Sequence, residues 1–246
     1  MKHILITGAA SGIGRAAALK LAAPDTRLTL IDRDASGLDT LMGEGAAGDL
    51  HAIPMDVSDT EAWARLDLGS TQITGAVIAA GISDAAPITE MSFADWRRLM
   101  SVNLDGAFLA LQAILRHAAE GASVVAVSSA TGKKAVPNTA AYGASKAALS
   151  QMVKVAALEG APRQIRVNAV APGGVKTPMF SNLDVFKELA AVHGSDDAAW
   201  AAMAVETPLK RFAEADEIAA FIEFLLGPDA VSITGATLDC DGGYSV

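Results

Sequence analysis

Residues 3–14 read HILITGAASGIG and join a short apolar run to a glycine-rich turn. The apolar run predicts a buried strand over residues 3–7, and the Ala-rich residues from Arg15 to about Ala23 predict a helix directly after the glycines. Glycine allows a tight turn and a close approach of backbone to a phosphate, which the amino terminus of a helix attracts. The spacing is Gly-x3-Gly-x-Gly, which differs from the Gly-x-Gly-x-x-Gly of the dinucleotide fingerprint and also fits an ordinary strand-to-helix turn. The stretch therefore indicates an α/β unit with a possible nucleotide site.

The same alternation of strand and helix continues along the chain. Further apolar runs predict strands at residues 27–31, 50–54, 76–79, 123–127, 165–170 and 237–240. Helical spacing predicts the main helices at residues 92–118, 139–159 and 214–226. Such alternation predicts a Rossmann-like, doubly wound parallel sheet of about seven strands with helices on both faces. The 246 residues fit a single α/β domain over residues 1–246, without repeats or linkers.

The end of the second predicted strand carries an acidic residue, Asp32, about 20 positions beyond the glycines. A carboxylate there can accept hydrogen bonds from an adenosine ribose and would repel a 2′-phosphate, so Asp32 favours NAD over NADP. Arg33 and Arg15 keep NADP open, because either could pair with a phosphate. Asp32 could also be a helix N-cap.

Two later strand ends carry weaker candidates for the same site. Asp56, followed by Val57, could reach an adenine amino group or could cap the next helix. Gly81, preceded by Ala80, lets the chain pass close to a flat ligand or simply forms a turn.

Tyr142 and Lys146 stand four residues apart in an Ala-rich run, so they share one face of a helix. The neighbouring ammonium is expected to pull the pKa of the phenol down, toward a value useful for proton transfer to an alcohol or carbonyl oxygen. Ser129 follows the predicted strand at 123–127 and faces the crevice where open α/β sheets bind ligands. Asn103 interrupts the apolar pattern of the helix at 92–118, either as hydrogen-bonded structure or as part of a site.

The composition excludes several classes of function. The formal net charge is −9, and Lys and Arg do not cluster beyond pairs, so nucleic-acid binding is not expected. The one cysteine, Cys240, allows neither an internal disulfide nor a cysteine metal site, and no metal is expected. The sequence shows no signal peptide and no apolar stretch of about 18 residues, so a cytoplasmic protein without a membrane segment is expected.

Two segments suggest binding surfaces. The helix at 139–159 is apolar nearly all round, so one face should pack on the sheet and another on a second subunit, giving a homo-oligomer, a dimer or a tetramer. Residues 179–207 show helical fragments and no strand, which predicts a substrate-binding lid or pocket wall. Their apolar composition favours a hydrophobic or mixed alcohol as substrate and leaves a polyol or sugar open.

These features together resemble the short-chain dehydrogenase/reductase family in its compact single-domain branch, over nearly the whole chain. Thr7-Gly8-x3-Gly12-x-Gly14 resembles that family's cofactor motif, and Ser129, Tyr142 and Lys146 match its catalytic spacing. Asn103 matches its fourth active-site position. The stretch Pro172-Gly173, Thr177 and the closing Asp241-Gly242-Gly243 also fit. One departure is Ala79-Ala80-Gly81, where the family usually has Asn-Ala-Gly, which puts a sheet-stabilising hydrogen bond in doubt.

The resemblance implies a role for each residue. Tyr142 would be the general acid/base, Lys146 would lower its pKa and hold the nicotinamide ribose, and Ser129 would bind the substrate oxygen. Asn103 would hold a water that relays a proton from Lys146. The residues implied to bind the cofactor are Gly8, Ser11, Gly12, Ile13, Gly14, Asp32, Arg33, Asp56, Val57, Ala80, Gly81, Tyr142, Lys146, Pro172, Gly173, Val175 and Thr177.

The function that follows is an NAD(H)-dependent oxidoreductase that interconverts a secondary alcohol, as a small-molecule substrate, and a ketone. Two alternatives remain open. One is an NADPH-dependent enzyme resembling 3-oxoacyl reductases, and the other is a dinucleotide-binding sensor without catalysis.

Overall fold

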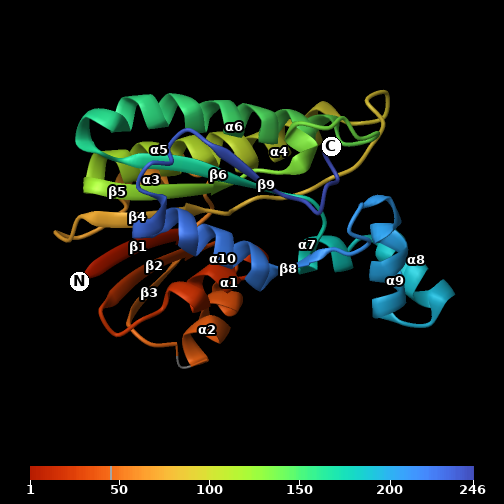
Figure 1. Cartoon of the computed structure of the whole chain (residues 1–246), viewed down its shortest axis with the longest axis horizontal. Coiled ribbons are helices and arrows are strands. Elements are labelled where there is room, and N and C mark those ends of the chain that lie inside the picture. Colours follow the sequence, from red (N-terminus) through yellow and green to blue (C-terminus); the bar gives the residue numbers. More distant parts are fainter. Residues whose placement is uncertain (45) are drawn as a thin grey trace.

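The computed structural model describes residues 1–44 and 46–246, and its centre is a parallel β-sheet (Figure 1). Within these residues seven strands pair in the order β3-β2-β1-β4-β5-β6-β9, all parallel. The strands are β1 (Lys2–Thr7), β2 (Thr26–Asp32), β3 (Asp49–Pro54), β4 (Ile73–Ile78), β5 (Ala118–Val127), β6 (Arg166–Pro172) and β9 (Thr237–Cys240). The predicted doubly wound sheet is confirmed, including the last strand at 237–240.

Helices cover both faces of the sheet and bury a separate apolar core on each face (Figure 1). One face carries α1 (Gly12–Leu21), α2 (Ala35–Gly43) and α10 (Ala215–Leu226). The other carries α3 (Thr60–Arg65), α4 (Phe93–Met100), α5 (Gly106–His117) and α6 (Ala140–Gly160). The five inner strands are largely buried on both faces, as inner parallel strands should be, whereas the edge strands β3 and β9 are partly exposed.

The predicted helix at 92–118 is continuous but not uniform. Ser92 caps it by accepting a hydrogen bond from the backbone N–H of Asp95, at 3.0 Å. Between α4 and α5 the chain makes a π-helical segment, Ser101–Asp105, with Asn103 at its centre. Such segments arise where one extra residue is accommodated in a helix, frequently at functional sites.

This joined helix also corrects one sequence expectation. Residues Phe93–His117 are long and apolar enough to cross a membrane by length and composition, although no such stretch was expected. In the structure the α5 side chains Ala110, Leu111 and Ile114 pack in the core against the sheet. The apolar character of the helix is therefore accounted for by the core that it covers.

The segment after β6 projects from the sheet as a separate helical group (Figure 1). It contains β7 (Val175–Lys176), α7 (Pro178–Ser181), α8 (Asp184–His193) and α9 (Asp196–Met203), and returns through β8 (Ala213–Glu214), which pairs with β7. Aromatic rings hold it together: Phe186 and Trp200 have centroids 4.3 Å apart, and Trp200 and Phe212 5.8 Å apart. The prediction that residues 179–207 contain helical fragments and no strand agrees with this structure.

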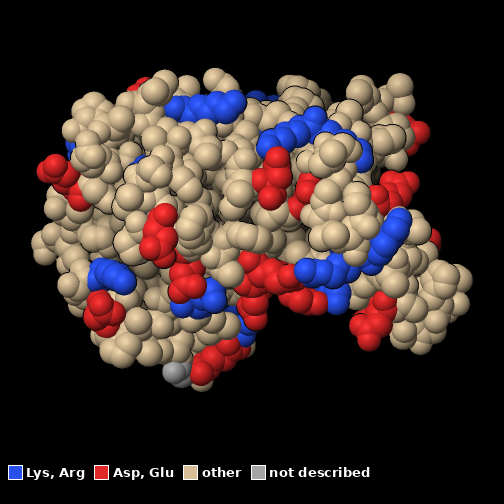
Figure 2. All heavy atoms as spheres, in the orientation of Figure 1, with Lys and Arg blue, Asp and Glu red and all other residues tan. Residues whose placement is uncertain are grey.

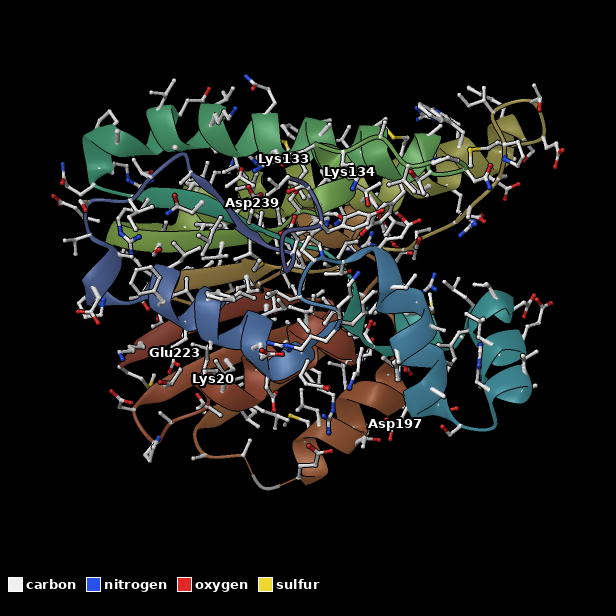
Figure 3. The ribbon with its side chains drawn as sticks, turned by 45° about the vertical axis from the view of Figure 1, so that its right-hand side comes forward. Lys20, Lys133, Lys134, Asp197, Glu223 and Asp239 are labelled. Carbon is white, nitrogen blue, oxygen red and sulfur yellow. The ribbon has the colours of Figure 1, made fainter. Side chains whose placement is uncertain are left out.

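Charged side chains are distributed over the surface without one dominant basic patch on the face that Figure 2 shows. Ion pairs join neighbouring elements instead. Lys20 of α1 lies 3.4 Å from Glu223 of α10, and Lys133 lies 2.5 Å from Asp239 of β9 (Figure 3).

Candidate active site

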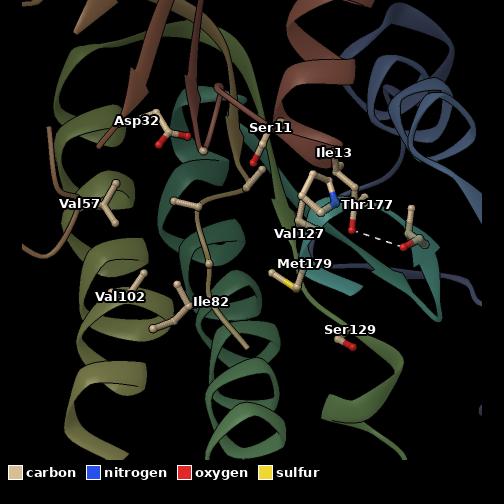
Figure 4. A pocket seen from close by; sticks show the side chains of 18 of the residues that line it. Ser11, Ile13, Asp32, Val57, Ile82, Val102, Val127, Ser129, Thr177 and Met179 are labelled. Carbon is tan, nitrogen blue, oxygen red and sulfur yellow. Dashed lines mark hydrogen bonds between the residues drawn. The ribbon is translucent and has the colours of Figure 1, made fainter. Parts of the chain in front are cut away.

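A cavity of about 570 Å³ lies at the carboxyl ends of the strands, where the strand order reverses between β1 and β4. Open α/β sheets bind ligands at this position. The cavity brings together every site residue expected from the sequence except Asn103. Asp32 and Ser129 lie at its opposite ends (Figure 4), so the cavity joins the acidic end of β2 to the end of β5.

The glycine turn forms one wall because only glycine fits at two of its positions. Gly8 has a φ of +72°, and a Cβ atom on it would lie 2.7 Å from the backbone nitrogen of Ala80. A Cβ on Gly14 would lie 2.1 Å from the carbonyl oxygen of Gly8, so α1 begins in contact with the turn. Ser11 precedes α1 without a side-chain cap, which leaves the first N–H groups of the helix directed at the cavity. This arrangement fits the diphosphate of a dinucleotide.

A threonine hydroxyl makes the connection that the departure at Ala79 puts in doubt. The buried Thr7 Oγ1 accepts hydrogen bonds from the backbone N–H groups of Ala79, at 3.2 Å, and Ala80, at 3.3 Å. The carboxyl ends of β1 and β4 are therefore tied together without an asparagine at position 79.

The carboxylate of Asp32 shapes the turn as well as facing the cavity. Its two oxygens accept from the backbone N–H groups of Ala10 and Asp34, each at 3.0 Å. Each oxygen keeps a lone pair for a further donor such as a ribose hydroxyl. Arg15 forms an ion pair with Glu44. Of the two arginines considered for a phosphate, Arg33 is the one that lines the cavity.

Tyr142 and Lys146 lie together, but the electrostatics differ from the sequence expectation. The Lys146 Nζ lies 5.7 Å from the Tyr142 ring centroid and donates a 2.8 Å hydrogen bond to the carbonyl oxygen of Val127. Burial raises the pKa of Tyr142 above its ordinary value, and the neighbouring Ser129 hydroxyl partly opposes this. Burial lowers the pKa of Lys146 to about 8. The expected lowering of the tyrosine pKa is therefore wrong, because loss of hydration outweighs the effect of the neighbouring amine.

Asn103 lies behind the cavity wall, where its side chain acts as a clamp. Its Oδ1 accepts from the backbone N–H of Ile82 at 2.8 Å, and its Nδ2 donates to the carbonyl oxygen of Ile82 at 2.9 Å. The same Nδ2 donates to Ser145 Oγ at 3.2 Å. The side chain is thus committed to structure, and it holds the chain after β4 against α6.

The projecting segment contributes less to the cavity than expected. Only its first residues reach it, with Met179, Phe180 and Asn182 lining the cavity, while Phe186 and Trp200 pack on each other. Other lining residues that the sequence did not single out are Asp34, Met55, Ala79, Ile82, Val102, Val127, Ser128 and Pro178. Most adjoin predicted residues in sequence; Ile82 and Val102 were recognisable only as apolar positions near Gly81 and Asn103.

Comparisons with known proteins cover the whole domain. A family model described as enoyl-(acyl carrier protein) reductase matches residues 8–245. Galactitol 2-dehydrogenase (L-tagatose-forming) of Cereibacter sphaeroides is 38% identical over 98% of this chain and 94% of its own length.

Solved structures agree with these sequence matches. A short chain dehydrogenase family protein from Francisella tularensis has a TM-score of 0.89 and 30% identity, covering 100% of this chain and 99% of its own. A 3-oxoacyl-[acyl-carrier protein] reductase from Brucella melitensis, solved with bound NAD, has a TM-score of 0.81 and 32% identity, over 100% and 91% of the two chains.

Proposed function

Because the chain belongs to the short-chain dehydrogenase/reductase family, we propose that it is an NAD(H)-dependent oxidoreductase that interconverts a secondary alcohol and a ketone. The observation that carries the proposal is the single cavity that Ser129, Tyr142 and Lys146 share with Asp32. A proton-transferring group at one end and an acidic ribose site at the other suit a dinucleotide lying between them.

The dinucleotide, when bound, supplies the hydride transfer, and the protein supplies orientation and proton handling. The uncapped start of α1 would hold the diphosphate, and Asp32 would accept from the adenosine ribose. Gly8 lies close to the backbone of Ala80, so the glycine turn packs tightly against this part of the cavity wall. The cavity is also lined by Pro172, Gly173, Val175 and Thr177, which would hold the part of the dinucleotide beyond its diphosphate.

Tyr142 exchanges a proton with the substrate oxygen in this proposal. Its raised pKa keeps the phenol neutral, ready to donate a proton to a ketone oxygen. Ser129 donates a hydrogen bond to the same oxygen and stabilises the charge that develops there. Lys146, when charged, favours the phenolate that alcohol oxidation requires.

The role of Asn103 follows from its contacts. Its side-chain oxygen already accepts from Ile82, so the amide serves to fix the wall beside Lys146. The same oxygen keeps a second lone pair, which could accept a hydrogen bond from a water in a proton relay.

The NAD preference rests on the negative charge of Asp32. An NADPH-dependent 3-oxoacyl reductase activity is the second candidate, favoured by Arg33 in the cavity and by the likeness to a 3-oxoacyl-[acyl-carrier protein] reductase. That relative was solved with NAD, which is consistent with NAD in this fold.

Thermal unfolding with saturating NAD, NADH, NADP and NADPH in parallel tests the cofactor. A ligand at about 100 times its dissociation constant stabilises the folded state by about 2.7 kcal/mol, which gives a clear shift. A shift with NADH that exceeds the shift with NADPH supports the proposal. A larger NADPH shift favours the reductase alternative, and no shift with any of the four contradicts the assignment.

Turnover then tests the substrate class. We expect NADH formation from NAD with a secondary alcohol, using galactitol as a polyol and cyclohexanol as an apolar alcohol. Exclusive activity on acetoacetyl-CoA with NADPH would support the second candidate. Tight cofactor binding without hydride transfer to or from any of these compounds would support the sensor alternative.

We also propose a homo-oligomer formed through α5 and α6. The groove between these helices exposes apolar side chains that a core position would bury: Phe108 is 50% exposed and Val155 45%. An apolar surface of this kind marks an interaction site. Light scattering should show a dimer or tetramer, and Val155→Glu should lower the mass. A wild-type monomer would contradict the proposal.

A further inference from the structure

Two hydroxyl groups, one buried and one partly exposed, link the chain just after β5 to the helix that carries Tyr142. Ser128 is 3% exposed and directly follows β5, and its Oγ donates to the carbonyl oxygen of Lys146 at 3.0 Å. Ser150, one turn further along α6, donates to the same oxygen at 3.0 Å. The two Oγ atoms are 2.7 Å apart.

The two hydroxyl protons are shared among three short contacts, so the two serines and the Lys146 carbonyl form one hydrogen-bonded group. Each hydroxyl has a single proton, so at any moment one of them donates to the Lys146 carbonyl and the other donates to its partner. Removing either hydroxyl therefore changes the bonding of the other. The carbonyl also belongs to the helix turn between Tyr142 and Ser150, so the unit acts on the backbone of α6.

Lys146 takes part in hydrogen bonds with the end of β5 through both its backbone and its side chain. The backbone oxygen of Lys146 accepts from the loop after β5, while its side-chain Nζ donates to Val127 O at 2.8 Å. Gly132 continues the contact, because a Cβ on it would lie 3.0 Å from the backbone nitrogen of Ala147. The loop that carries Ser129 therefore packs closely against the turn of α6 that carries Lys146.

We propose that Ser128 and Ser150 are positioning residues that hold Ser129 at a fixed place relative to Tyr142 through the carbonyl of Lys146. This inference rests on the proposed function, in which Ser129 and Tyr142 act on one substrate oxygen. Ser129 is bonded covalently to Ser128, so loss of the Ser128 anchor frees the hydroxyl of Ser129 to shift. A misplacement of about 1 Å can reduce turnover about 100-fold.

The chain offers a matched control on the same strand. Ser123 is 2% exposed in β5, and its Oγ donates to the carbonyl oxygen of Leu225 at 2.9 Å. Ser123→Ala therefore removes a buried hydroxyl-to-carbonyl bond of similar length from the middle of β5, away from the cavity. It should lower stability as Ser128→Ala does, without reaching the site.

The state of Tyr142 can be measured without any substrate. The sequence contains two tyrosines, so in a Tyr244→Phe background a ¹³C-labelled tyrosine reports the pKa of Tyr142 alone. Because the Ser129 hydroxyl beside the phenol lowers that pKa, Ser129→Ala should raise it. Ser128→Ala should shift it in the same direction, and Ser150→Ala should do so to a smaller extent.

The decisive experiment compares Ser128→Ala, Ser150→Ala and Ser123→Ala in tyrosine titration and in turnover with the better of galactitol and cyclohexanol. We expect kcat to fall about tenfold or more in Ser128→Ala, with the dissociation constant for NADH unchanged, and to stay at the wild-type value in Ser123→Ala. A tyrosine pKa and kcat in Ser128→Ala equal to those in Ser123→Ala would overturn the inference.

Two further outcomes remain interpretable. If Ser128→Ala does not fold, Ser150→Ala decides the matter, since Ser150 is partly exposed and its loss removes the partner of the Ser128 hydroxyl; an unchanged tyrosine pKa there overturns the inference. If the wild type transfers no hydride, the proposed reaction fails, but the tyrosine titration still tests the link between Ser128 and Tyr142.

Discussion

The ammonium group of Lys146 donates a hydrogen bond of 2.8 Å to the carbonyl oxygen of Val127, at the end of β5. It is 4% exposed, and the structure pairs it with no carboxylate among the residues described. A cation in this position is costly to the fold, which is why burial lowers its pKa to about 8. Such a cost is expected where a residue is kept for chemistry rather than for stability.

Replacing this lysine should therefore stabilise the protein. Lowering the pKa from 10.5 to about 8 corresponds to about 3 kcal/mol at neutral pH, at about 1.4 kcal/mol per pKa unit. Lys146→Met removes the penalty but also the bond to Val127, worth about 1 kcal/mol. We expect a higher unfolding midpoint at pH 7 in the absence of cofactor, together with loss of turnover.

The pH dependence of the free energy of unfolding provides a control for the prediction on Lys146→Met. The folded state binds fewer protons than the unfolded state between pH 8 and 10.5, so wild-type stability rises with pH over this window. The advantage of Lys146→Met should shrink as the pH rises through it. A variant less stable than wild type at pH 7 would show that the lysine contributes to the fold.

The charge of Asp32 should set the choice between the two dinucleotides. Asp32→Ser keeps an acceptor for the N–H groups of Ala10 and Asp34 and removes the charge that opposes a 2′-phosphate. We expect the ratio of the NADPH to the NADH dissociation constant to fall about tenfold or more, which corresponds to about 1.4 kcal/mol. An unchanged ratio, measured by calorimetry, would mean that Asp32 acts only as a turn residue.

His3 should make the protein sensitive to acid at the opposite end of the sheet. The ring is fully buried and bonded to Thr71 O and Thr29 Oγ1, each at 2.9 Å, and burial lowers its pKa below 6.5. The unfolded state takes up a proton below pH 6.5 while the folded state does not, so stability is complete above that pH and is lost as the pH falls through the folded pKa. Urea midpoints should fall between pH 7 and about pH 5 in the wild type and less in His3→Gln. Equal losses in both proteins would assign the acid sensitivity to other groups.

The fold could be predicted closely because local patterns and global architecture agree. Each apolar run bounded by polar residues became a strand, and Ser92 capped the helix that its position indicated. The hydrogen bonds of Asn103 with Ile82 could not be predicted, because the two residues lie 21 apart in the sequence. The aromatic packing of Phe186 on Trp200 is likewise a tertiary contact without a local signal.

The residues that line the cavity were largely predictable, whereas their electrostatics were not. Ser129, Tyr142 and Asp32 were identified by spacing and by their place at strand or helix ends, and the topology then brought them together. The direction of the Tyr142 pKa shift depends on how much water reaches the phenol, which no sequence spacing reports. The compensation for Ala79 by Thr7 was missed because threonine in a strand has an ordinary packing role.

The most direct test of the proposed function compares wild type with Tyr142→Phe in alcohol oxidation, with NAD and with galactitol or cyclohexanol. Phenylalanine keeps the ring and removes only the hydroxyl group, and thermal shifts with NADH show whether the cofactor still binds. The proposed role predicts NADH formation by the wild type and a loss of about 100-fold or more in kcat for the variant, with the NADH shift retained. Unchanged turnover by Tyr142→Phe would contradict the assignment of this phenol as the group that exchanges the proton.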